Sequence, residues 1–129
     1  MIYRLTNIEN DDFIAGLLKE LEYEIRNGEY EKIMSSEMVK SSNNTKGIEI
    51  QELIIHIVDW YNANGQILEN VLTGITVAGV YDVLKYVVKR LKNTNEYGPE
   101  KKIEIIQENE EGHKQKFVIT MQEIMENDR

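Results

Sequence analysis

The stretch from Val71 to Val88 is the most apolar part of the chain, and it constrains the fold more than any other feature. It belongs to a longer segment, residues 66–92, that we expect to form the main helix. Apolar residues occur all round this predicted helix, with Gly74 and Gly79 among them. A helix that is apolar on every side must be enclosed. The segment therefore predicts a deep core position, an interface, or both.

We expect a second copy of the chain to supply part of this enclosure. A helix in a two-layer domain exposes about half of its circumference to water, and the exposed half should be polar. The apolar stretch has no continuous polar face, and closed two-fold dimers are the commonest soluble assemblies. The predicted interface residues are Val71, Leu72, Ile75, Val80, Val83, Leu84, Val87 and Val88. The competing interpretation is that the helices of one chain and the Ile48–Tyr61 segment enclose the stretch by themselves.

Two segments near the start of the chain have clear patterns. Residues 2–8 (IYRLTNI) read as a short strand. Residues 13–25 place apolar side chains at three- and four-residue steps, which predicts an amphipathic helix. Asn10, Asp11 and Asp12 precede this helix and supply capping oxygens and negative charge at its N-terminus.

The next segments are less distinct. We expect one or two further helical turns from residue 29, with Met34 and Met38 on their apolar side, and then a polar loop at 40–47 (KSSNNTKG). Residues 48–61 fit a helix by periodicity. They also fit a strand, because they are rich in β-branched residues and bounded by turn formers. The strand is the interpretation we favour.

The C-terminal part of the chain predicts a β-hairpin. Residues 102–109 and 114–122 alternate and flank the turn sequence EEGH, and residues 125–129 are expected to fray. The whole pattern indicates a single α+β domain over residues 1–129. Its expected order is β-α-β-α-β-β, a small mixed sheet with two main helices packed on it. The alternative is a mainly α fold with a C-terminal β-hairpin.

An excess of acidic residues excludes several classes of partner. The net charge is −8, from 23 Asp and Glu against 15 Lys and Arg. Such a surface repels phosphate backbones and anionic lipids, because binding either one requires clustered Lys and Arg. We therefore expect no nucleic acid and no membrane as a partner. The charge favours a basic protein partner or simple solubility.

The sequence also bears on the compartment. It contains no cysteine, which excludes disulfide bonds, thiolate nucleophiles and Cys-ligated zinc. The start of the chain has neither the basic nor the apolar region of a secretory signal. The apolar stretch carries Asp82 and Lys85 and barely reaches the length of a membrane span. These observations predict a soluble protein of the cytoplasm.

Residues able to carry chemistry are few. If residues 48–61 were helical, Glu52, His56 and Asp59 would share one face and could contact one metal ion. A strand instead sends His56 and Asp59 to opposite faces, and His113 falls in the predicted hairpin turn. Neither a nucleophile elbow nor a phosphate-binding glycine loop occurs. We expect no catalytic residue, metal or cofactor, and the basic residues Lys85–Lys92 are explained by the negative end of the helix dipole.

Three classes of function remain. The leading hypothesis is a non-enzymatic, acidic protein-interaction or regulatory module that self-associates, most simply as a dimer, through its apolar helix. A second is an immunity protein or antitoxin that neutralises a basic partner protein. A third is a small enzyme that binds a metal or another ligand. No motif in the sequence identifies a family.

Overall fold

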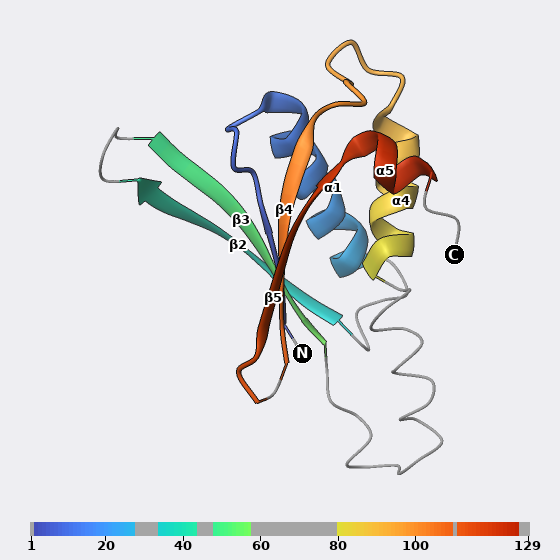
Figure 1. The fold of residues 1–129 in the computed structure, drawn as a ribbon. Coiled ribbons are helices and arrows are strands. Elements are labelled where there is room, and N and C mark those ends of the chain that lie inside the picture. The colour runs from blue at the N-terminus through green and yellow to red at the C-terminus, as the bar shows by residue number, and fades with distance from the viewer. Residues whose placement is uncertain (1, 28–33, 44–47, 58–79, 110, 127–129) are drawn as a thin grey trace, which may run out of the picture.

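The computed structural model describes residues 2–27, 34–43, 48–57, 80–109 and 111–126. Within these ranges five strands form one sheet, and three helices lie on one side of it (Figure 1). The elements in chain order are β1 (Ile2–Thr6), α1 (Asp12–Asn27), β2 (Met34–Asn43), β3 (Ile48–Ile57), α4 (Val80–Leu91), β4 (Lys102–Glu108), β5 (Lys114–Thr120) and α5 (Met121–Glu126).

The strand order is β2-β3-β1-β4-β5, and every neighbouring pair is antiparallel. Since β1 and β2 both run antiparallel to β3, they are parallel to each other, and α1 connects them across β3. In the same way β3 and β4 are parallel on either side of β1, with α4 in the connection between them. Two interleaved split β-α-β units result, the arrangement of ferredoxin-like folds, extended here by β5 and α5.

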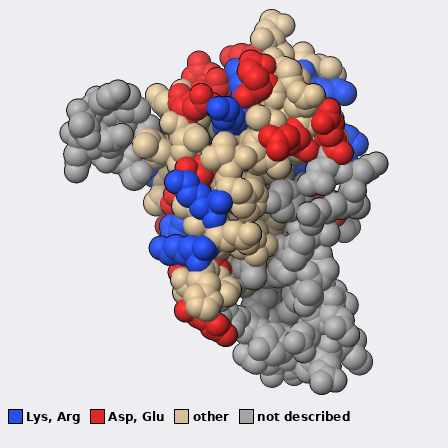
Figure 2. Space-filling model, in the orientation of Figure 1, with Lys and Arg blue, Asp and Glu red and all other residues tan. Residues whose placement is uncertain are grey.

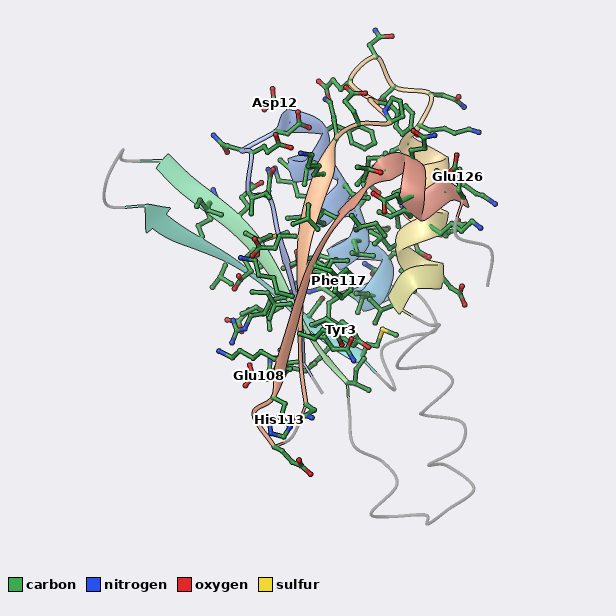
Figure 3. All side chains as sticks on the ribbon, in the orientation of Figure 1. Tyr3, Asp12, Glu108, His113, Phe117 and Glu126 are labelled. Atoms are coloured by element: carbon green, nitrogen blue, oxygen red, sulfur yellow. The ribbon has the colours of Figure 1, made fainter. Side chains whose placement is uncertain are left out.

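The core lies between the sheet and the helix layer. Most of the strand side chains on the helix side are apolar, Tyr3 among them (Figure 3), and the hydroxyl of Ser36 in β2 is buried between them. Each helix packs one apolar stripe against these side chains and keeps its polar side chains on the outer, solvent-exposed side. The fully buried residues of the strands and of α1 include Tyr3, Leu5, Ile14, Leu17, Leu18, Leu21, Ile25, Met34, Leu53, Ile55 and Ile103.

The predicted cap of α1 is confirmed, and Asp11 provides it. The Asp11 carboxylate accepts a hydrogen bond from the backbone N–H of Ile14 at 3.1 Å, which satisfies one of the free donors at the helix start. The buried Asn7 side chain holds Asp11 in place, because its amide donates to the Asp11 carbonyl and its oxygen accepts from the Asp11 N–H, both at 2.9 Å. The polar turn after β1 thus sets the direction in which α1 leaves the sheet.

The predicted α+β class is confirmed, with two differences in the sheet. It is antiparallel throughout the described strands rather than mixed, and it gains a strand where helical turns were expected. Met34 and Met38 are four residues apart, a spacing that lies on one face of a helix and equally of a strand. Pairing with β3 decides for the strand, with Met34 opposite Ile57 and Met38 opposite Leu53. The expected loop at 40–47 is therefore wrong for residues 40–43, which belong to β2.

The other segment predictions have mixed outcomes. The strand favoured for residues 48–61 is confirmed over Ile48–Ile57, and the C-terminal hairpin is confirmed as β4 and β5. The predicted second strand is wrong at residues 121–122 and the frayed C-terminus is wrong at residues 125–126, because Met121–Glu126 forms α5. The Thr120 hydroxyl accepts from the Glu123 N–H at 3.1 Å, and the Glu123 carboxylate accepts from the Thr120 N–H at 3.2 Å. This is a capping box, and Thr-x-x-Glu was its signal in the sequence.

The apolar helix differs most from its prediction. Of residues 66–92, the structure describes α4 from Val80 to Leu91, and 66–79 lie outside the described residues. Within α4 the polar face that we expected to be missing exists, because the side chains exposed on it are Asp82, Tyr86, Lys89 and Arg90. The predicted interface residues in this helix, each at most 2% exposed, are Val80, Val83, Leu84, Val87 and Val88. They belong to the buried core of the described part of the chain.

Replacing Leu84 with Ala tests this assignment. Leu84 is 0% exposed, so its truncation leaves a cavity and should lower the free energy of unfolding by about 2–5 kcal/mol. Lys89→Ala on the exposed side of α4 is the control and should change it by about 0.5 kcal/mol or less. Urea denaturation at fixed protein concentration measures both. A Leu84→Ala protein as stable as the Lys89→Ala protein would contradict the core assignment.

Candidate functional site

The candidate site is the side of the sheet that carries no helix among the described residues (Figure 1). We call it the open face. It consists of three rows of side chains that cross the sheet from β2 to β5. The first row is Val39, Glu52, Thr6, Glu104 and Val118, the second is Glu37, Ile54, Arg4, Ile106 and Lys116, and the third is Ser35, His56, Ile2, Glu108 and Lys114.

Apolar and charged side chains alternate across this face. An antiparallel sheet with one solvated side normally shows polar residues there, yet the rows of the open face contain the apolar residues Ile2, Val39, Ile54, Ile106 and Val118. Val118 is 46% exposed. Isoleucine flanks Arg4 on both neighbouring strands, so the middle row is apolar on either side of one cation. Such a surface is suited to a protein partner.

The centre of the open face is held by a charge network. Arg4 Nη1 lies 3.1 Å from Glu52 Oε1, and the Thr6 hydroxyl donates to Glu52 Oε2 at 3.0 Å. Nearer β5, Lys116 Nζ lies 3.5 Å from Glu104 Oε2. Each pair joins neighbouring strands across the sheet, so the charges in the middle of the face are largely compensated within one chain.

The charges at the two edges of the face differ in sign. The edge strand β5 carries Lys114 and Lys116, and Lys and Arg side chains gather beside it in Figure 2. The opposite edge strand, β2, carries Glu37 in the same row as Lys116. The open face therefore has a basic edge and an edge with an acidic residue in the corresponding position.

The outer side of the helix layer has a separate cluster. Arg90 of α4 lies 2.9 Å from Glu20 and 3.3 Å from Glu24 of α1, and its guanidinium is 5.3 Å from the centre of the Tyr86 ring. Desolvation lowers the pKa of Arg90, but hydrogen bonds to Glu24 and Tyr86 and the nearby carboxylates outweigh it, so its pKa lies above the usual value. These contacts tie α4 to α1, in addition to the dipole effect expected for its basic residues.

The residues singled out for metal chemistry do not come together. Glu52 and His56 lie on the open face of β3 with Ile54 between them, and Asp59 lies outside the described residues. Within the part of the chain that the structure describes, no three His, Asp or Glu side chains could hold one metal ion. His113 lies at the tip of the hairpin (Figure 3), where it and Glu111 are both 78% exposed. Its predicted place in a solvated turn is confirmed.

Two shallow pockets lie at the margins of the sheet. One, of about 240 Å³, is lined by Ile25, Arg26, Met34, Ser35 and Ser36. The other, of about 190 Å³, lies at the hairpin and is lined by Gln107, Asn109, His113, Lys114 and Gln115. Both are smaller than typical small-molecule sites of about 300–1,000 Å³. Neither set of lining residues places a nucleophile beside a base.

Comparisons with protein-family models, with curated proteins and with solved structures found no match. Among the described residues, no helix has the length and apolar character needed to cross a membrane. The interface residues Val71, Leu72 and Ile75 lie outside the described residues, and the remaining five lie in the core. The open face was not among the predicted sites, although the alternation of apolar and charged residues in 102–109 was its signal.

A substitution on the open face should leave the fold intact. Glu52→Gln removes the charge that pairs with Arg4, but both side chains are partly exposed, at 24% and 34%. Solvent screens such pairs, so the loss of unfolding free energy should not exceed about 1 kcal/mol.

The buried Asn7 is the matched comparison for this substitution. It is 0% exposed, and Asn7→Ala would leave the N–H of Asp11 without its acceptor, while the Asp11 carbonyl would keep the N–H of Ala15 as a donor. We expect a loss of about 1–3 kcal/mol. Thermal and urea unfolding of both variants measure the contrast, and a Glu52→Gln protein less stable than Asn7→Ala would contradict it.

Proposed function

We propose that this chain is a non-enzymatic protein-interaction module of the cytoplasm that self-associates through the open face of its sheet. The observation that carries the proposal is the composition of that face, where Ile2, Ile54 and Ile106 stand among charged residues on three adjacent strands. Partly exposed β-branched residues in the middle of a sheet face lose water-exposed area when a partner covers them.

The burial of α4 supports moving the interface from the helix to the sheet. The apolar residues Val80, Val83, Leu84, Val87 and Val88 are each at most 2% exposed and belong to one core cluster with residues of α1 and the strands. The outer sides of α1 and α4 are joined by Arg90 and two glutamates, which gives them a polar surface. We therefore place the proposed self-association on the open face of the sheet and not on the apolar residues of α4.

A second candidate is an immunity protein or antitoxin for a basic partner. It is favoured by the Asp and Glu side chains that gather at the end of the molecule where α1 begins (Figure 2). Exposed acidic residues in the segments near this end are Glu9, Asp12, Glu96, Glu100, Glu123 and Glu126. Affinity purification from the native host tests it. Stoichiometric capture of one basic protein, lost in a Glu96→Gln/Glu100→Gln variant, would favour this candidate.

The leading proposal is tested by the mass of the protein in solution. The chain has a mass of 15.1 kDa. Sedimentation equilibrium over a concentration series should give a weight-average mass that rises from this value toward twice this value. A mass of 15.1 kDa at every concentration would contradict self-association.

A further inference from the structure

We propose that two copies pack open face against open face, across a two-fold axis that runs parallel to β1 and passes between the two β1 strands. The inference rests on the proposed self-association and specifies its geometry. A face-to-face dimer can have its two-fold axis along the strands or across them. The order of charged side chains across the sheet determines which charges face each other in each case.

A two-fold axis relating two stacked sheets lies in the plane between them. If it runs along the strands, it places β5 of one copy over β2 of the other, β4 over β3, and β1 over β1. If it runs across the strands, each strand lies over its own equivalent. Both arrangements are isologous, and the charges on the open face distinguish them.

The axis along the strands brings opposite charges together. In the second row Glu37 lies opposite Lys116 of the second copy, and Ile54 lies opposite its Ile106. In the third row His56 lies opposite the second copy's Glu108, where an imidazole N–H can donate to a carboxylate. Each of these contacts occurs twice, because the symmetry repeats it.

Most of the remaining contacts along this axis are apolar or already compensated, and the other two place Ser35 opposite the second copy's Lys114 and Thr6 opposite Thr6. In the third row Ile2 meets Ile2, and in the first row Val39 meets the second copy's Val118. Arg4 meets Arg4, but each is paired with Glu52 of its own chain at 3.1 Å. Glu52 meets the second copy's Glu104. Arg4 partners Glu52 within its own chain, and Lys116, 3.5 Å from Glu104, is shared between this carboxylate and Glu37 of the other copy.

The axis across the strands is unfavourable. Along the second row it would place Glu37 over Glu37 and Lys116 over Lys116, whereas the contact of Arg4 with Arg4 is common to both axes. It would also bring Glu104 over the second copy's Glu108. Like charges that face each other in an interface cost free energy, so the arrangement along the strands is the one selected.

The dimensions of the face fit a weak, reversible dimer. Stacked sheets lie about 10 Å apart and cross at about 30°, which displaces edge residues by a few ångströms. Glu37 and Lys116 have long side chains that can span this offset. Five strands at a spacing of about 4.8 Å outline a face about 24 Å wide. This is small for a specific interface, so we expect dissociation in the micromolar range.

Charge exchange between chains tests the pairing of Glu37 with Lys116. Glu37→Lys and Lys116→Glu should each raise the dissociation constant about tenfold or more, because two opposite-charge contacts become like-charge contacts. Mixing the two variants should restore the dimer, since every such contact in the heterodimer again joins a cation to a carboxylate. Glu96→Lys makes the same charge change outside the sheet and should dimerise as the wild type does. Sedimentation equilibrium measures all four samples.

A cross-link provides a second measurement. The chain has no cysteine, so a single introduced thiol reports on one position. Ile2→Cys lies beside the axis and should form a disulfide-linked dimer under mild oxidation, whereas Tyr86→Cys on the helix side should not. Circular dichroism checks that every variant is folded.

The outcomes separate the two proposals. Loss of dimer in each single variant, recovery in the mixture and cross-linking through Ile2→Cys would support the geometry. A wild-type dimer that neither variant weakens, with no cross-link at residue 2, would overturn the geometry and leave self-association standing. A wild-type protein that is monomeric at every concentration would overturn both.

Discussion

The pairing of β1 with a strand on each side is the interaction on which the rest of the structure depends. The strand is only five residues long, yet it is the only part of the described chain that joins the β2–β3 hairpin to the β4–β5 hairpin within the sheet. Its alternation sends Tyr3 and Leu5 into the core and Arg4 to the centre of the open face. The register of β1 therefore determines which of its side chains are buried in the core and which lie on the open face.

Because the helices cover one side of the sheet, the open face on the other side is the surface that a partner can cover. The apolar stripes of α1 and α4 are buried in the core, and the outer sides of these helices are polar, with Arg90 joined to Glu20 and Glu24. The open face keeps isoleucines beside ion pairs that its own chain already satisfies. A partner that covers the middle of this face gains apolar burial over charges that are already paired, which reduces the desolvation cost that often cancels the gain at charged interfaces.

The sequence predicts those parts of the fold that local patterns determine. The α+β class, β1, the cap and stripe of α1 and the C-terminal hairpin follow from periodicity and turn residues, whereas β3 follows from its β-branched composition and bounding turn formers, against a helical periodicity. β2 could not be predicted in this way, because the spacing of Met34 and Met38 fits one face of a helix and of a strand equally well. Its pairing with β3 is a tertiary interaction that local sequence does not determine. The open face could not be predicted because it combines residues from five strands whose order is invisible in the sequence. The interface predicted on Val80–Val88 rested on the absence of a continuous polar face, whereas α4 exposes Asp82, Lys89 and Arg90 and buries its apolar residues beside α1 and α5.

Side-chain footprinting by hydroxyl radicals over a range of protein concentrations tests the central claim, that the helices fill the core and the open face binds the second copy. His56 reports on the open face, while Tyr23 and Tyr86, 62% and 52% exposed, report on the helix side. As the dimer forms, oxidation of His56 should fall and oxidation of both tyrosines should stay constant. Protection of Tyr23 and Tyr86 with no change at His56 would place the partner on the helices and contradict the account.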